Sequence, residues 1–242
     1  MINTAMVLAA GHGTRMRPLT NDRAKAMVEV GGKPLVDHML DRLNEAGVER
    51  AVVNVHAHAD HLEAHLNARN AGPEIIISDE RERLLETGGG MVKALPLLGE
   101  GPVFVCNIDA IWQEGETPLI PSLLARWDGD IMDDLLVLAP VDRTLGYDGE
   151  GDFLFGHDGR PEYRGDRETA PYVYAGVQIT KLDRLAKEPV EPFTRKRIWA
   201  HTLAAGTLYG YPMDGFWMHV GDPQAREEAQ KILQTKKSRL EK

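Results

Sequence analysis

The sequence has very little cysteine, with Cys106 as its single thiol in 242 residues. A lone cysteine cannot form an intramolecular disulfide, so the chain is not one of the small secreted domains held together by disulfides. No apolar run reaches the length of a signal peptide or of a membrane-spanning helix. These absences predict a cytoplasmic protein that does not attach to a membrane.

The chain also lacks an excess of positive charge. It carries 28 Lys and Arg residues against 37 Asp and Glu residues, for a formal net charge of −9. Binding to nucleic acid or to an anionic membrane surface requires a basic face, so the composition argues against both classes of partner. With 43% hydrophobic and 27% charged residues, the chain has the composition of an ordinary globular protein, and its length suits one large α/β domain.

Two common nucleotide-binding fingerprints are missing as well. The dinucleotide fingerprint G-x-G-x-x-G begins at Gly11 and Gly13, but Met16 occupies the place of the third glycine. No G-x-x-x-x-G-K-[ST] motif is present around Gly32 and Lys33. The sequence therefore excludes the standard dinucleotide and P-loop motifs.

A glycine loop with a basic surround is nevertheless present. The apolar run Ala5–Ala10 predicts a strand buried on both faces of a parallel sheet. Gly11 and Gly13 then allow a sharp turn in which backbone N–H groups approach a ligand, although any tight strand exit also favours glycine. Between Gly11 and Lys33, five basic residues outnumber two acidic ones: Arg15, Arg17, Arg23, Lys25 and Lys33 against Asp22 and Glu29. This local reversal of sign indicates a site for a polyphosphate.

Strand and helix patterns alternate along the chain. Apolar residues at helical spacing follow Pro34 and end at Gly47, and Ala51–Val55 is the next strand. Asn54 near the end of that strand is a candidate ligand contact near the glycine loop, with a cap on the turn as the alternative. Further strands are expected at 74–78, 102–107, 135–140 and 172–179, with helices at 60–67, 91–97, 118–127 and 223–234. This order predicts an α/β fold, a doubly wound, mostly parallel sheet with helices on both faces.

A second informative stretch covers residues 85–98. Three glycines, Gly88 to Gly90, precede the helix expected from Met91. Glycines are a poor start for a helix, which indicates either a flexible loop or a backbone that lies flat against a ligand such as a nucleobase. Glu86 and Thr87 would then offer polar groups to the edge of that base.

The strand at 102–107 runs directly into Asp109. In open α/β sheets, ligands bind beyond the carboxyl ends of the strands, and Mg²⁺ prefers oxygen ligands. Asp109 is therefore the first candidate for a metal ligand, with a cap on the following turn as the alternative.

Several of these residues together resemble a known signature. The sugar-phosphate nucleotidyltransferase pattern L-x-x-G-x-G-T-R-(L/M)-x-P-L-T, followed by a lysine between prolines, is similar to Leu8, Gly11, Gly13, Thr14, Arg15, Pro18, Leu19, Thr20 and Lys25. Ala24 and Ala26 replace the two prolines. The run L-E-T-G-G-G at 85–90 resembles the branch that uridylylates N-acetylmuramate 1-phosphate. The resemblance implies a Rossmann-like, GT-A-type single domain over 1–242, with a nucleotide-binding half at 1–112 and a sugar-phosphate-binding half at 113–242.

The same resemblance implies an activity, the transfer of a nucleotidyl group from an NTP, UTP first, to a sugar 1-phosphate with release of pyrophosphate. Arg15 would hold the β and γ phosphates, Lys25 would meet the α phosphate, and Asp109 would hold Mg²⁺ or Mn²⁺. The nucleotide would also contact Gly11, Gly13, Thr14, Asn54, Glu86, Thr87 and Gly88.

For the acceptor, the resemblance implies Asn107, Gly151 and Gly176 as sugar-phosphate-binding residues. In the family motif W-x-D-V-G-T the aspartate is a second metal ligand, whereas this chain has His219 there and Asp222 at the place of the threonine. Imidazole nitrogen favours softer metals than Mg²⁺, so either residue is open as the second ligand.

Two alternatives stay open. Within the enzyme class, the alternative is guanylyl transfer to mannose or heptose 1-phosphate. In another class, Ala24 and His219 suggest a nucleotide-sugar-binding regulator that has lost catalysis. No feature of the sequence predicts an oligomeric state.

Overall fold

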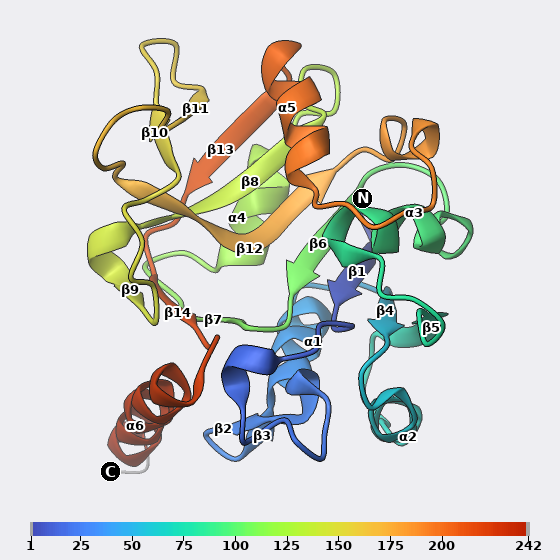
Figure 1. Cartoon of the computed structure of the whole chain (residues 1–242). Helices are drawn as coiled ribbons and strands as arrows, with labels where there is room; N and C mark the ends of the chain where they lie inside the picture. The colour runs from blue at the N-terminus through green and yellow to red at the C-terminus, as the bar shows by residue number, and fades with distance from the viewer. Residues whose placement is uncertain (1, 241–242) are drawn as a thin grey trace.

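A computed structural model describes residues 2–240 of the chain and the side chains of residues 2–235. Its largest sheet has nine strands, and Figure 1 shows it crossing the centre of the molecule. Four neighbouring strands run parallel in the order β6-β1-β4-β5: β1 (Thr4–Leu8), β4 (Arg50–Val55), β5 (Glu74–Asp79) and β6 (Val103–Asn107). They are connected through α1 (Leu35–Glu45), α2 (Ala59–Asn67) and α3 (Glu86–Leu98).

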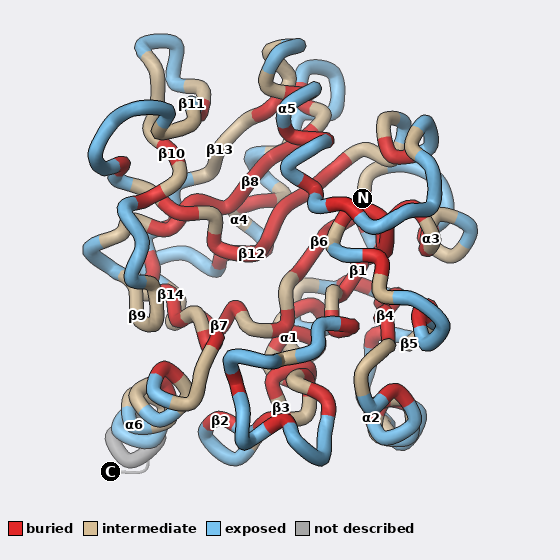
Figure 2. Tube along the Cα trace, in the orientation of Figure 1, coloured by how far each residue is buried: buried red, intermediate tan, exposed pale blue. Residues whose placement is uncertain are grey.

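These strands are apolar along their length because helices cover both faces. Val7 and Val53 belong to the core cluster that contains Leu40 of α1. Met6 and Val52, which alternate with them, pack in the cluster that contains Met91 of α3. In Figure 2 the central strands are accordingly buried, while exposed residues gather on the outer loops and helices.

Antiparallel strands extend the sheet beyond β6. The long strand β12 (Tyr172–Thr180) pairs antiparallel with β6 and with β8 (Asp134–Pro140), and β13 (Leu208–Pro212) lies parallel to β8. A hairpin of β10 (Phe153–Phe155) and β11 (Pro161–Tyr163) pairs with the start of β12. The predicted α/β class with a mostly parallel core is confirmed, and the antiparallel strands come from the second half of the chain.

The described residues also form two smaller sheets and three further α-helices. One sheet joins β7 (Ala110–Gln113), β14 (Phe216–His219) and β9 (Thr144–Leu145), and the other pairs β2 (Glu29–Val30) with β3 (Lys33–Pro34). The helices are α4 (Leu119–Arg126), α5 (Lys196–Ala204) and α6 (Pro223–Leu240). Within the described residues, no helix has the length and apolar character needed to span a bilayer.

The glycines of the 85–98 stretch lie inside a helix, so the expectation that the helix begins at Met91 is wrong. Helix α3 begins at Glu86, and the Phe193 carbonyl accepts hydrogen bonds from the backbone N–H of Gly88 at 2.7 Å and of Gly89 at 3.3 Å. These are two of the four N–H groups that a helix start leaves without an internal partner. A Cβ atom at Gly88 would clash with Phe193, and one at Gly89 with the Glu191 carbonyl. The flat backbone therefore faces protein, where a nucleobase was expected.

Gly89→Ala tests this packing. In most helix interiors this change stabilises a protein by about 0.5–1 kcal/mol. Here we expect a loss of about 1–3 kcal/mol, because the new methyl group must displace the backbone at Glu191. Urea unfolding of the two proteins measures the difference, and a gain in stability for the variant would show that the neighbouring segment yields freely.

Candidate active site

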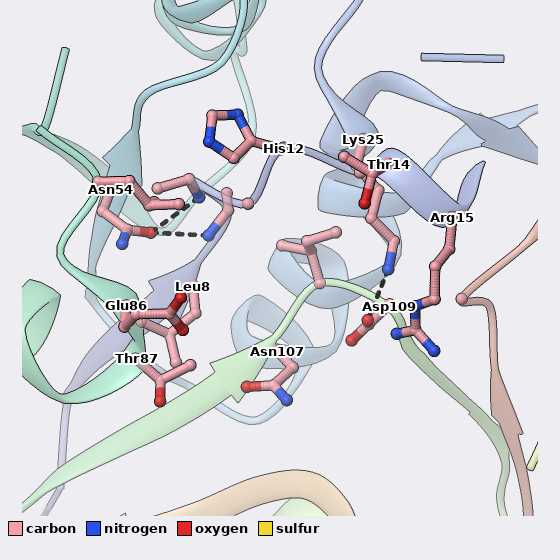
Figure 3. Close-up of a pocket in the computed structure, with 17 residues that line it drawn as sticks. Leu8, His12, Thr14, Arg15, Lys25, Asn54, Glu86, Thr87, Asn107 and Asp109 are labelled. Atoms are coloured by element: carbon pink, nitrogen blue, oxygen red, sulfur yellow. Dashed lines mark hydrogen bonds and ion pairs between the residues drawn. The ribbon is translucent and has the colours of Figure 1, made fainter. Parts of the chain in front are cut away.

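A cavity of about 480 Å³ opens where the parallel strands end. Its walls come from the loops that follow β1, β5 and β6, and Figure 3 shows their side chains converging on it. Predicted site residues that line it are Gly11, Gly13, Thr14, Arg15, Lys25, Asn54, Glu86, Thr87, Asn107 and Asp109. The structure therefore brings together most of the nucleotide site that the sequence suggested.

The loop after β1 turns at Gly13, which has a φ of +62°. A side chain there would be strained, and its Cβ would lie 2.9 Å from the Cβ atom of Lys25. The hydroxyl of Thr20 donates a hydrogen bond to the Gly13 carbonyl at 2.8 Å. A Cβ atom added at Gly11, in contrast, would meet no heavy atom within 4 Å, so the backbone there borders open space. The loop is thus held from behind and open toward the cavity.

A partly buried ion pair crosses the cavity floor. Lys25 Nζ lies 2.7 Å from Asp109 Oδ2, with side chains only 11% and 19% exposed. His219 Nε2 lies 3.3 Å from the same oxygen. Burial would raise the pKa of Asp109, but the charge of Lys25 and the hydrogen bond with His219 outweigh it and hold that pKa well below its usual range. The carboxylate is therefore ionised at neutral pH.

Arg15 supplies a second positive charge beside this pair (Figure 3). Its side chain is exposed, and among the described residues it forms no ion pair. A planar guanidinium in this position is suited to bidentate binding of phosphate. Arg15 and Lys25 together give the cavity the cationic wall expected of a polyphosphate site.

The polar atoms of Asn54 are all engaged within the protein near the glycine loop. It is 2% exposed, and its Oδ1 accepts hydrogen bonds from the backbone N–H of Ala9 at 2.7 Å and of Ala10 at 3.3 Å. Its Nδ2 donates to Glu80 Oε1 at 2.7 Å. Although Asn54 lines the cavity, its polar atoms hold the glycine loop from behind.

The start of α3 forms the opposite wall. Glu86 has a φ of +60° and an exposed side chain, and Thr87 Oγ1 accepts a hydrogen bond from Arg195 N at 3.1 Å. Gly88 does not line the cavity, and its N–H is bonded to Phe193. Glu86 and Thr87 therefore line the cavity, whereas Gly88 supports the wall from behind.

The three residues expected to bind the acceptor are not gathered in one place. Asn107 lines the cavity. Gly176 has a φ of +80° at an irregularity of β12, and its close neighbours are the side chains of Asn107 and Ala110. Gly151 lies in the loop before β10, where its close neighbour is the Ala170 backbone. Sugar binding by these residues stays a prediction.

For a divalent cation, Asp109 is the carboxylate that lies beside Lys25 on the cavity floor, whereas Glu86, which also lines the cavity, stands on the opposite wall. Asp109 Oδ2 is engaged by Lys25 and His219, and Oδ1 has no hydrogen bond to the described residues. The carboxylate of Asp222 caps α6 by accepting a hydrogen bond from Ala225 N at 2.9 Å. No group of three or more His, Cys, Asp or Glu side chains in the described region could hold a metal. This donor set fits Mg²⁺ bound mainly by phosphates and water, which needs only one or two protein carboxylates.

The sequence prediction missed several residues of the site, among them His12, Gly221 and Glu80. His12 and Gly221 line the cavity, and Glu80 is fully buried behind it. His12 is the unspecified residue between the two glycines, and Gly221 belongs to the 215–223 segment, where the sequence pointed only to metal ligands. Glu80 stands in the run D-E-R-E-R, whose charge pattern is typical of an exposed loop.

Comparison with known families identifies the class of protein in which this arrangement of cavity residues occurs. The "Nucleotidyl transferase" family model matches residues 4–125, which carry nearly the whole cavity wall. The chain belongs to this family. The nucleotidyltransferase is 54% identical to N-acetylmuramate alpha-1-phosphate uridylyltransferase of Caulobacter vibrioides, over 95% of this chain and 96% of the relative. A Neisseria meningitidis protein of the same name is 31% identical over 94% and 97% of the two chains.

More distant similarities share the fold. Mannose-1-phosphate guanylyltransferase catalytic subunit beta of Drosophila melanogaster is 28% identical over 91% of this chain and 60% of its own length. The crystal structure of HddC from Yersinia pseudotuberculosis complexed with GMP-PN has a TM-score of 0.75 at 21% identity, covering 96% of this chain and 99% of the other. Apo UDP-glucose pyrophosphorylase has a TM-score of 0.79 at 15% identity, covering 98% and 100%.

Glu86→Gly should stabilise the fold. Glu86 holds a left-handed conformation that costs a non-glycine residue about 1–2 kcal/mol, and glycine adopts it without this strain. We expect a gain of about 0.5–1 kcal/mol in the free energy of unfolding, after the entropy cost of glycine. Urea unfolding measures it, with Glu82→Gly on the same exposed loop as the control that should lose stability. Equal losses in the two variants would contradict the strain at Glu86.

Proposed function

We propose that this nucleotidyltransferase transfers a uridylyl group from UTP to N-acetylmuramate 1-phosphate and releases pyrophosphate. The observation that carries the proposal is the position of Lys25 and Asp109, which meet at 2.7 Å beside an open glycine loop. The 54% identity to the Caulobacter vibrioides uridylyltransferase supports the choice of both substrates.

The reaction needs little acid–base chemistry from the protein. The attacking oxygen belongs to a phosphate that is already ionised at neutral pH, so no general base has to remove a proton. It attacks the α phosphorus of UTP while the bond to the pyrophosphate oxygen breaks. Catalysis then rests on alignment and on neutralising the charge that gathers on phosphate oxygens.

The residues divide this work by position. The backbone N–H groups of the loop at Gly11 and Gly13, with Arg15, bind the β and γ phosphates and stabilise the leaving pyrophosphate. Lys25, held on the cavity floor by Asp109, meets the α phosphate. Thr87 and Glu86 face the base edge from the opposite wall.

A divalent cation, Mg²⁺ or Mn²⁺, held by Asp109 would neutralise phosphate charge when bound. His219 lies near enough to act with Asp109, whereas Asp222 is engaged at the start of α6. We therefore favour His219 over Asp222 as a second ligand.

The same proposal assigns the two substrates to different halves of the chain. All cavity residues except Gly221 come from positions 8–109, which supports residues 1–112 as the nucleotide-binding half. Residues 113–242 then form the sugar-phosphate-binding half, with Gly151 and Gly176 as candidates. Action in the cytoplasm, where nucleoside triphosphates are available, stays a prediction.

Guanylyl transfer to mannose or heptose 1-phosphate is the second candidate. The guanylyltransferases among the relatives support it, but at identities near 28%. A grid assay of pyrophosphate release over UTP, dTTP, GTP and CTP against several sugar 1-phosphates, with Mg²⁺ and Mn²⁺ in parallel, separates the two. We expect UTP with N-acetylmuramate 1-phosphate to give the highest kcat/KM, and preference for GTP would overturn the uridylyl assignment.

Lys25→Met tests the phosphate contact while keeping the length of the side chain. Removal of one preorganised hydrogen-bond donor from an oxyanion hole lowers kcat by about 10²–10³-fold, and we expect a loss of at least this size for a charged donor. Lys33→Met is the matched control, because Lys33 pairs with Asp41 at 2.6 Å outside the cavity and should keep kcat within about twofold.

The result is read together with a melting curve for each variant. A folded K25M protein that releases pyrophosphate at the wild-type rate would contradict the role of Lys25. A wild-type protein that binds UTP but turns over none of the sugar phosphates would favour the regulatory alternative.

A further inference from the structure

A carboxylate is fully buried behind the cavity without a cation to balance it. Glu80 has an exposed fraction of 0%, and in the described part of the chain no lysine, arginine or histidine pairs with its side chain. Burying a charge in this way is costly unless hydrogen bonds satisfy it. The contacts of this carboxylate therefore indicate why it is there.

Both oxygens of Glu80 accept hydrogen bonds from the two walls of the nucleotide cavity. Oε1 accepts from Asn54 Nδ2 at 2.7 Å, and Oε2 accepts from Leu85 N at 3.1 Å. Asn54 in turn accepts the N–H groups of Ala9 and Ala10. A continuous path of hydrogen bonds thus runs from the glycine loop, through Asn54 and Glu80, to the residue that precedes Glu86.

Helix α3 packs tightly against Glu80 and Asn54. A Cβ atom at Gly90 would lie 2.6 Å from Glu80 Oε1 and 3.0 Å from Asn54 Nδ2. Helix α3 can approach the pair this closely because position 90 has no side chain. The same closeness prevents the carboxylate from moving without moving α3.

We propose that Glu80 and Asn54 are positioning residues that set the distance between the phosphate-binding loop and the base-binding wall. Neither group needs to touch the nucleotide, because Asn54 orients the loop and Glu80 fixes Asn54 and the start of α3. This inference rests on the proposed use of the cavity by a nucleoside triphosphate, UTP in the first instance.

Two single substitutions break the path in different ways. Glu80→Gln leaves one acceptor for two donors, so either Asn54 Nδ2 or Leu85 N loses its partner. Asn54→Asp instead sets two carboxylates against each other. We expect the dissociation constant for UTP to rise about ten- to a hundredfold in E80Q and further in N54D, with a smaller change in the KM for the sugar phosphate.

The double variant E80Q/N54D exchanges amide and carboxylate between the two positions. The new carboxylate accepts the Ala9 and Ala10 N–H groups and the new amide N–H, while the new amide oxygen accepts Leu85 N. Every hydrogen bond and the single negative charge are thereby retained. We expect UTP binding within about threefold of wild type, a coupling between the two positions that separate effects would not produce.

Two controls separate positioning from stability. Glu82→Gln, exposed on the same loop, should leave UTP binding unchanged. Leu66→Ala, a core truncation in α2, should lower the melting temperature without altering the UTP dissociation constant. Binding is measured by calorimetry with UTP and Mg²⁺ at a temperature where each protein is folded.

The outcomes are distinct. If wild-type protein binds no UTP, the proposed function fails. If wild type binds and E80Q binds equally well, or if the double variant is no better than the worse single one, the positioning role is overturned. If E80Q does not fold, the double variant decides the question. A double variant that folds and binds UTP like the wild type supports the positioning role, and a double variant that fails to do so overturns it.

Discussion

The ion pair between Lys25 and Asp109 is the contact on which the site depends, because it joins segments 84 residues apart in the chain. Lys25 follows the glycine loop of β1, and Asp109 follows β6, the neighbouring parallel strand. Adjacent strands that run in one direction end at the same edge, so the sheet itself brings the two charges together. Without the pair, each would be a partly buried charge lacking its strongest partner.

Most of the fold could be predicted from the sequence because the patterns that indicate its strands and helices are local. Uninterrupted apolar runs mark strands covered on both faces, and the signature from Leu8 to Lys25 is long enough to indicate a family. For the same reason, the cavity residues of the first half were found together. The expected helix start at Met91 failed because Phe193, about one hundred positions later, supplies the carbonyl that caps the helix.

Residues whose role depends on partners distant in the chain could not be identified from the local sequence pattern. Glu80 stands among charged neighbours and is nevertheless fully buried, since only the folded chain sets it against Asn54 and Leu85. Gly176 was predicted to bind the sugar phosphate, and only the fold sets it beside Asn107 on the adjacent strand. A glycine in the sequence indicates where another group must come close to the backbone, but only the fold determines which group that is.

The carbonyl of Phe193 and the N–H of Arg195 both serve the start of α3, although they belong to the other half of the chain. The proposed nucleotide-binding half is consequently not a self-sufficient module. A fragment that ended before these residues would retain Arg15 and Lys25 yet leave the start of α3 without these two contacts. Under the proposed function, exchange of the second half between relatives would therefore alter nucleotide selection too, unless the 191–195 segment were kept together with α3.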